Sequence, residues 1–402
     1  MKNVVIVDSV RTAIGKLGGA MKDVTADYLG EYVIRELLER TQVDANEIDE
    51  VILGQAKQSA DISNVARVSS LRAGLPLSVP GYTLHRQCGS GLQSINSAVQ
   101  QIQSENADIV IAGGVESMST APYYVSGVRF GVTAGNVELK DPNTASQPGS
   151  QPQEVYGTAI TMGWTSDNIA KQYEITREEQ DAYALRSQQR AQHAIEVGLF
   201  ADQIVPVEMK QRKKVITFNV DEHPRETTME ALAKLRPVFS PDGTTTAGNA
   251  SGRNDGAAAL LVMSEDKAKE LGYTKGVRVV AQAAVGVDPV TMGLGPIPAT
   301  RKALEKAGLT IDDIDVVELN EAFAAQTLAF FKEFNLPYDS EKVNPNGGAI
   351  ALGHPIGATG AILMTKLMHE LHRTGKRYGL VTLCIAGGIG IATIVENLSV
   401  SE

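Results

Sequence analysis

The sequence repeats one pattern in its two halves: a turn of small residues, a helix, an apolar strand and then Ala-Gly-Gly. In the first half the turn is Gly89-Ser90-Gly91, and the strand ends at Ala112-Gly113-Gly114. In the second half the turn is Gly357-Ala358-Thr359-Gly360, and the strand ends at Ala386-Gly387-Gly388. This repetition indicates an internal duplication. Two similar units predict a pseudo-twofold, with a cleft where the ends of their strands meet.

Strands and helices alternate through both halves, which favours an α/β sheet covered on both faces. The apolar and periodic patterns predict strands at 3–7, 50–54, 107–114, 277–281 and 315–319, and helices at 25–40 and 88–104. Residues from about 118 to 250 break this alternation. We expect them to form an insertion on the sheet, with hairpins over 123–140, a loop over 143–153 and a polar helix over 177–197.

Length and charge limit the classes of function. A chain of 402 residues predicts two or three domains, and a net charge of −10 argues against general nucleic-acid binding. The basic run 210–214 fits either a solvated face or a phosphate site. Two cysteines make no disulfide framework, and no apolar run is long enough to span a membrane. We expect a cytosolic protein without a signal segment.

Four polar residues occupy strand ends or glycine-rich turns, where α/β folds place their sites. Cys88 lies at a predicted helix start, where the helix dipole would depress the pKa of a thiol. Asn320 follows an apolar strand, His354 lies in a glycine-rich turn, and Cys384 closes the last strand before Ala-Gly-Gly. The alternatives are an inert packing cysteine, a helix N-cap asparagine and a structural loop histidine.

Together the four residues provide the groups needed for acyl transfer. A thiolate beside an imidazole accepts an acyl group as a thioester, and a second cysteine near neutral pKa could move a proton next to a carbonyl. Backbone N–H groups of the glycine turns could hold the developing oxyanion. Dinucleotide and P-loop fingerprints are absent from the sequence. His369, Glu370 and His372 do not have zincin spacing, so we expect no metal site.

The longer motifs resemble those of the thiolase family over nearly the whole chain. They are Cys-Gly-Ser-Gly-Leu-Gln at 88–93, Gly-Gly-Val-Glu-Ser-Met-Ser at 113–119, Lys-Leu-Arg-Pro-Val-Phe at 234–239, Thr-Ala-Gly-Asn-Ala-Ser-Gly at 246–252, Asn-Asp-Gly-Ala-Ala at 254–258, Asn-Glu-Ala-Phe at 320–323, the glycine-rich run 347–360, and Leu-Cys-Ile at 383–385.

The resemblance implies two βαβαβαββ halves in a five-layer α-β-α-β-α core with an inserted loop domain. Residues 1–118 plus 251–272 would form the first half, 119–250 the loop domain and 273–402 the second half. It also implies a homo-oligomer, a dimer of dimers, with 123–140 as the segment through which the tetramer forms.

The resemblance also assigns catalytic roles. Cys88 matches the acyl-accepting nucleophile, and His354 matches the base that activates it and contributes to one oxyanion hole. Asn320 matches the residue that holds a water in that hole. Cys384 matches the acid/base for the α-proton of the second acyl-CoA. The N–H groups of Cys88 and Ala386 would form the other oxyanion hole, although the family usually has glycine where Ala386 stands.

The implied substrates are CoA and acyl-CoA, with no permanently bound cofactor. The positions that match CoA-contacting or acyl-pocket residues are Ser251, Met162, Met292, Ala322 and Phe323. Members specific for acetoacetyl-CoA often have histidine where Thr161 stands. Substrates beyond acetoacetyl-CoA, among the 3-ketoacyl-CoA thioesters, therefore stay open.

The expected function is acyl-CoA C-acetyltransferase activity. It comprises reversible Claisen condensation of two acetyl-CoA, and CoA-dependent cleavage of 3-ketoacyl-CoA, through an acyl-cysteine. Two alternatives remain: a non-catalytic acyl-CoA or lipid carrier, and a decarboxylating ketoacyl synthase on the same fold. A carrier needs none of the four polar residues, and a synthase would have histidine or asparagine in place of Cys384.

Overall fold

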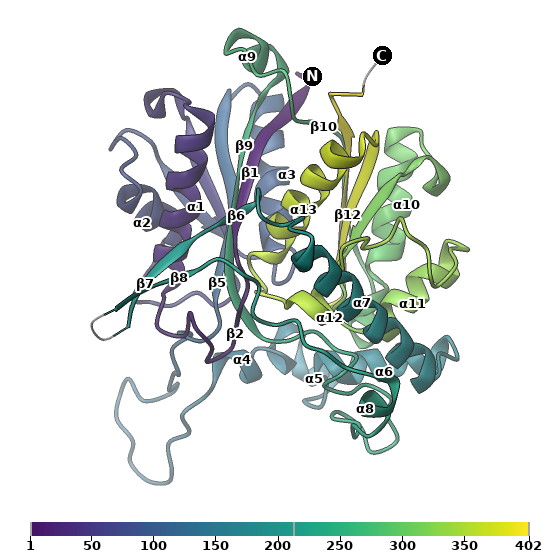
Figure 1. The fold of residues 1–402 in the computed structure, drawn as a ribbon. Helices are drawn as coiled ribbons and strands as arrows, with labels where there is room; N and C mark the ends of the chain where they lie inside the picture. The colour runs from purple at the N-terminus through teal and green to yellow at the C-terminus, as the bar shows by residue number, and fades with distance from the viewer. Residues whose placement is uncertain (1, 212–213, 401–402) are drawn as a thin grey trace.

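The computed structural model describes residues 2–211 and 214–400, and two similar half-sheets meet in its centre (Figure 1). The first half-sheet has the order β4 (Gly81–Leu84), β3 (Glu50–Gly54), β5 (Ile109–Ser117), β9 (Asn254–Ser264), β1 (Val4–Thr12). The second continues with β10 (Val277–Gly286), β13 (Ile389–Asn397), β12 (Tyr378–Ile385) and β11 (Val316–Leu319). Strands β1 and β10 pair antiparallel at the junction.

The two half-sheets have the same pairing senses, which confirms the duplication. Strands β3 and β5 are parallel, as are β11 and β12. Strand β9 runs antiparallel to β5, and β13 runs antiparallel to β12. In each half a helix precedes the second strand of the parallel pair: α3 (Ser90–Gln103) before β5, and α13 (Thr359–Thr374) before β12.

The helices complete five layers in the order α-β-α-β-α (Figure 1). Helices α1 (Ala26–Thr41) and α2 (Val65–Arg72) cover the outer face of the first half-sheet, where Leu29 and Val33 are fully buried. Helices α10 (Pro296–Ala307) and α11 (Ala324–Glu333) cover the outer face of the second half-sheet. Helices α3 and α13 lie between the two half-sheets. The predicted five-layer architecture is therefore confirmed.

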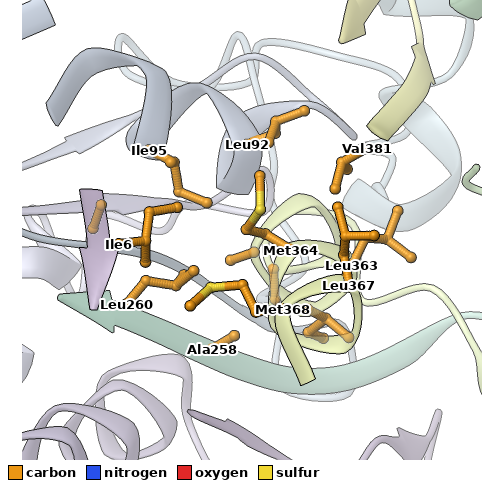
Figure 2. Close-up of a cluster of buried hydrophobic side chains, with 14 of the residues drawn as sticks. Ile6, Leu92, Ile95, Ala258, Leu260, Leu363, Met364, Leu367, Met368 and Val381 are labelled. Atoms are coloured by element: carbon orange, nitrogen blue, oxygen red, sulfur yellow. The ribbon is translucent and has the colours of Figure 1, made fainter. Parts of the chain in front are cut away.

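The middle layer holds a large apolar cluster to which α3, α13 and both half-sheets contribute (Figure 2). Leu92 and Ile95 of α3, spaced i, i+3, lie in this cluster with Met364 of α13, so an apolar stripe of each helix is buried between the half-sheets. Burying an aliphatic side chain contributes about 1.5–3 kcal/mol. The apolar spacing that predicted a helix over 88–104 is therefore also what docks the two halves.

Glycines allow the backbones of the two halves to touch. A Cβ at Gly91 would lie 2.8 Å from the backbone N of Ala361, and one at Gly114 would lie 2.3 Å from the carbonyl O of Gly357. Such distances exclude any side chain at these two positions. The turns predicted from the repeat thus lie against each other across the pseudo-twofold.

The remaining segments complete the molecule. The segment between β5 and β9 holds α4 (Pro142–Ala145), η2 (Pro148–Ser150), α5 (Gln153–Tyr156), α6 (Met162–Gln172), α7 (Arg177–Glu196), β6 (Ile204–Val205), β7 (Val207–Gln211), β8 (Lys214–Phe218) and α8 (Met229–Ala233). The other short elements are β2 (Gly15–Lys16), η1 (Ala45–Glu47), α9 (Glu265–Glu270), η3 (Pro289–Leu294), η4 (Ile311–Asp313) and α12 (Ala349–Leu352).

Two local expectations in the inserted segment were wrong. Residues 123–140 form no hairpin strands but a long loop closed by one isolated bridge, in which Tyr124 and Lys140 exchange backbone hydrogen bonds of 3.1 and 2.9 Å. The segment 143–153 is not a plain loop, because Asp141 caps α4 by accepting from the Asn143 N–H at 2.9 Å. The polar helix at 177–197 is confirmed as α7.

Arg212 and Lys213 of the predicted basic run 210–214 lie outside the described residues. The boundaries predicted for the two halves and the loop domain stay a prediction. Among the described residues, no helix is long and apolar enough to cross a membrane.

The contact between the halves generates a stability prediction. Gly114→Ala should lower the free energy of unfolding by about 1–3 kcal/mol, because the new Cβ overlaps the Gly357 carbonyl. Gly149→Ala is the control, since a Cβ there has no atom within 4 Å. Urea unfolding of both variants at equal protein concentration tests this. Equal stability of Gly114→Ala and the parent would contradict the close packing of the two halves.

Candidate active site

A cavity of about 170 Å³ opens where the start of α3, the turn before α13 and the end of β12 meet. This is the junction at which the repeat predicted a cleft. The predicted site residues that line it are Cys88, Met162, Ser251, Met292, Ala322, Phe323, His354, Cys384 and Ala386. Asn320 is the one predicted site residue that does not line it.

Cys88 stands just before α3, whose first residue is Ser90. The turn is held by Ser90 Oγ, which accepts from the Arg86 N–H at 2.8 Å and donates to the Gln87 carbonyl at 2.7 Å. Gln87 has a φ of 46°, in the left-handed region. A Cβ at Gly89 would lie 2.4 Å from Cδ1 of Ile385, so a larger residue there would require the Ile385 side chain to move.

The expectation of a depressed pKa at Cys88 was wrong in direction. Burial raises the pKa of the Cys88 thiol, because desolvation disfavours the thiolate. The backbone N–H groups of Ala386 and Cys88 and the charge of Lys57 oppose this shift without reversing it. The half-buried Cys88 side chain is therefore a thiol near neutral pH and needs a base when it attacks.

His354 has the geometry of that base. Its Nδ1 lies 2.6 Å from Thr359 Oγ1, and this hydroxyl donates its only hydrogen to the Pro355 carbonyl at 2.9 Å. Thr359 must therefore accept from Nδ1–H, which leaves Nε2 unprotonated. Nε2 is buried and has no partner among the described residues. Burial lowers the pKa of His354 to about 4, so the ring is neutral at pH 7.

Cys384 ends β12 within a small apolar cluster that also contains Met292, Ala322 and Phe323. Burial raises the pKa of its thiol well above the ordinary value, and the neighbouring Cys88 raises it further. The expectation that Cys384 is held near neutral pKa was therefore wrong. A buried thiol of this kind carries its proton until a change in its surroundings favours the thiolate.

Asn320 is fully buried beside this cluster. Its backbone N–H donates to the Thr382 carbonyl at 3.0 Å, which fixes it against β12. Neither Oδ1 nor Nδ2 has a hydrogen-bond partner among the described residues. The N-cap alternative is wrong, because α11 begins at Ala324 and Phe323 is its N-cap. Orphaned buried amides are uncommon and mark positions where a polar ligand group is expected.

Two supporting residues were missed by the sequence reasoning. Glu116 accepts from the N–H groups of Ala56, Lys57 and Gly357 at 3.0, 3.0 and 2.8 Å, and so joins the His354 turn to the first half. Asn254 Oδ1 accepts from the His354 N–H at 2.9 Å. Both lie in quoted motifs. The sequence feature that could have identified Glu116 is an acidic residue just after the paired glycines at 113–114.

Among the described residues, no group of three histidine, cysteine or acidic side chains could hold a metal ion. The side chains that line the cavity include two thiols and one free imidazole nitrogen.

Comparison with known proteins covers the whole chain. The family model "Thiolase, N-terminal domain" matches residues 4–266, and "Thiolase, C-terminal domain" matches residues 273–397. An acetyl-CoA acetyltransferase of Syntrophomonas wolfei is 48% identical, over 99% of this chain and 100% of the relative. A 3-oxoadipyl-CoA/3-oxo-5,6-dehydrosuberyl-CoA thiolase of Escherichia coli is 50% identical, over 99% of this chain and 100% of the relative.

Solved structures also match this chain over nearly its whole length. The Bacillus anthracis acetyl-CoA acetyltransferase superposes with a TM-score of 0.92 at 49% identity, covering 99% of both chains. Human mitochondrial 3-ketoacyl-CoA thiolase also gives a TM-score of 0.92, at 44% identity, covering 98% of this chain and 99% of that one.

The two thiols should differ in reactivity. Iodoacetamide should label Cys88 faster than Cys384, because Cys88 is half-buried whereas Cys384 is 1% exposed and its pKa is further raised by Cys88. Because the Cys88 pKa is raised, its labelling rate should keep rising from about pH 7 to about pH 9. Peptide mapping across this range measures both rates. Faster labelling of Cys384, or a Cys88 plateau below about pH 8, would contradict the assignment.

Proposed function

The chain belongs to the thiolase family, and from this premise we propose how its residues divide the acyl-CoA C-acetyltransferase reaction. The observation that carries the proposal is the presence of two cysteines and a free imidazole nitrogen at one cavity. Cys88 is the nucleophile, His354 its base, and Cys384 the acid/base for the α-proton. The carrier and decarboxylating-synthase alternatives have no support from the relatives.

The first half-reaction acylates Cys88. His354 Nε2 takes the thiol proton as the Cys88 sulfur attacks the carbonyl carbon of acetyl-CoA. The N–H groups of Cys88 and Ala386 stabilise the oxyanion, which fits their lowering effect on the Cys88 pKa. The imidazolium then returns the proton to the departing CoA sulfur. Because the Cys88 thiol and the His354 imidazole are both neutral before the reaction, the thiol proton moves to Nε2 as the sulfur attacks.

The second half-reaction needs the thiolate of Cys384. In the acetyl-enzyme Cys88 is a thioester and cannot ionise, so no charge on its sulfur can raise the pKa of Cys384. The thiolate takes an α-proton from the second acetyl-CoA, and the resulting carbanion attacks acetyl-Cys88. Cys384 ionises by passing its proton to His354 Nε2, which is unprotonated again once CoA has left. This proton then moves from Nε2 to the departing Cys88 sulfur.

The second acyl-CoA carbonyl needs its own oxyanion hole. We assign this role to His354 together with a water held by the free amide of Asn320. CoA and acyl-CoA are substrates, with no permanent cofactor. Ser251, Met162, Met292, Ala322 and Phe323 are proposed to contact the pantetheine and acyl groups.

The assembly and location are also proposals. The loop 123–140 exposes a row of apolar side chains, including Phe130 at 99% and Leu139 at 64% exposure. An exposed apolar loop of this size supports a homo-oligomer, and we propose a dimer of dimers. Both cysteines are free thiols, which supports the cytosol as the compartment.

The division of roles predicts that variants of the two cysteines fail at different steps. Cys88→Ala should form no acetyl-enzyme with acetyl-CoA, because no sulfur remains to accept the acyl group. Cys384→Ser should still become acetylated, and its condensation rate should fall by about 10²–10⁴-fold, because a hydroxyl is a far weaker acid than a thiol. Intact-protein mass spectrometry together with turnover assays measures both steps.

The parent enzyme is the control for both variants. Acetylation of Cys88→Ala combined with failure to acetylate Cys384→Ser would mean that the two roles are reversed.

A further inference from the structure

The cavity has two chemically different walls. One is the apolar cluster of Met292, Ala322, Phe323 and Cys384, against which Met162 and Ala250 pack. The other, which we call the polar wall, consists of Lys57, Gln87, Ser146, Ser150 and Arg253. Its members are linked by hydrogen bonds: Lys57 Nζ donates to Ser146 Oγ at 2.5 Å, and Gln87 Nε2 donates to Ser150 Oγ at 3.4 Å.

Lys57 is the residue of the polar wall that lacks a full set of partners. It is only 7% exposed, yet Ser146 Oγ is the single hydrogen-bond acceptor of its Nζ among the described residues. An ammonium group has three donors, so two remain free beside the cavity. Burial lowers the pKa of Lys57, while Glu116 and Cys88 act against that shift. Buried lysines are normally paired, and leaving one unpaired is costly.

The carboxylates nearest to Lys57 have other partners. Glu116 receives three backbone N–H bonds, and none of its oxygens lies within the 4.0 Å ion-pair distance of Lys57 Nζ. Asp141 Oδ2 lies 3.9 Å from a guanidinium nitrogen of Arg253, at the more exposed end of the polar wall. No aspartate or glutamate among the described residues lines the cavity. The polar wall therefore presents positive charge to whatever is attached to Cys88.

The chemistry of the substrate limits what can meet that charge. The pantetheine arm is uncharged next to the thioester, and the phosphates of CoA lie at its far end. An anion close to Cys88 must therefore belong to the acyl chain. During thiolytic cleavage this chain stays on the Cys88 sulfur while acetyl-CoA departs, so its distal end lies within the cavity.

We propose that Lys57 binds a terminal carboxylate of the acyl chain, so that the enzyme takes 3-oxoacyl-CoA thioesters of dicarboxylic acids. The inference rests on the proposed function, because it needs the acyl group on Cys88. Lys57 is a specificity-determining residue in this account. The carboxylate supplies the acceptor that its two free donors lack, and a neutral chain of equal length leaves them unpaired.

Lys57 could instead act on the nucleophile alone, since its charge favours the Cys88 thiolate. The two roles give different results. An effect on Cys88 changes the rate with every substrate equally and moves the pH profile of Cys88 labelling. Recognition of a carboxylate changes the rate only with substrates that carry one.

The test compares thiolytic cleavage of 3-oxoadipyl-CoA with that of 3-oxohexanoyl-CoA, which has the same chain length without the carboxylate. The enzymes are the parent, Lys57→Met, which keeps most of the stem but not the charge, and Lys275→Met as an exposed-lysine control. The parent should prefer 3-oxoadipyl-CoA in kcat/KM. Lys57→Met should lose at least about 30-fold more kcat/KM on 3-oxoadipyl-CoA than on 3-oxohexanoyl-CoA, whatever loss the two substrates share through Cys88.

A measurement on the parent alone covers the case in which Lys57→Met does not fold. Cys88 should be acylated faster by succinyl-CoA than by butyryl-CoA, which has the same number of carbons, as followed by intact-protein mass spectrometry. If Lys57→Met does fold, its activity on 3-oxohexanoyl-CoA shows that its active site is intact.

Several outcomes would overturn the inference. These are an equal loss on both substrates in Lys57→Met, a parent that prefers the neutral chain, or a parent that cleaves acetoacetyl-CoA but neither longer substrate. In each case the thiolase reaction itself still stands. A parent that cleaves none of the three substrates would instead refute the proposed function, and the inference with it.

Discussion

The carboxylate of Glu116 joins the two halves of the molecule at the point where the active site forms. From β5 it accepts N–H bonds from Ala56 and Lys57 in the first half and from Gly357 in the second. Hydrogen bonds to a charged group contribute about 1.5–3 kcal/mol each. Gly114 makes this possible, because the Gly357 carbonyl lies where its side chain would be. The placement of His354 and Lys57 around Cys88 depends on this junction.

Burial governs the chemistry more than charge does. It raises the pKa of both cysteine thiols and lowers that of His354 to about 4, so the empty site holds neutral acids beside a neutral base. A site of this kind moves protons only as bonds form and break, because isolated charges are costly in it. The two half-reactions have a fixed order, because Cys88 must carry the acetyl group before the carbanion can attack it. The acetylated Cys88 also cannot ionise, so it cannot raise the pKa of Cys384.

The repeat and its helical spacing were enough to predict the duplicated α/β halves and the cleft between them. Cys88 was found from its place at a helix start, His354 from its glycine-rich turn, and Asn320 and Cys384 from their places at strand ends. Local electrostatics could not be predicted, because the depth at which Cys88 is buried depends on the packing of the opposite half. The same holds for Glu116 and Lys57, whose partners lie far away in sequence. The hairpins expected over 123–140 did not form, because the backbone of this loop pairs only at the Tyr124–Lys140 bridge.

In the proposed reaction the acyl group resides on Cys88, in an oxyanion hole shared by the two halves. The most direct measurement is a crystal structure of the enzyme after mixing with acetyl-CoA. We predict an acetyl group on Cys88 Sγ, with its carbonyl oxygen accepting from the N–H groups of Cys88 and Ala386 and with a free Cys384 nearby. An acetyl group on Cys384, or an acetyl oxygen directed away from both N–H groups, would contradict the account.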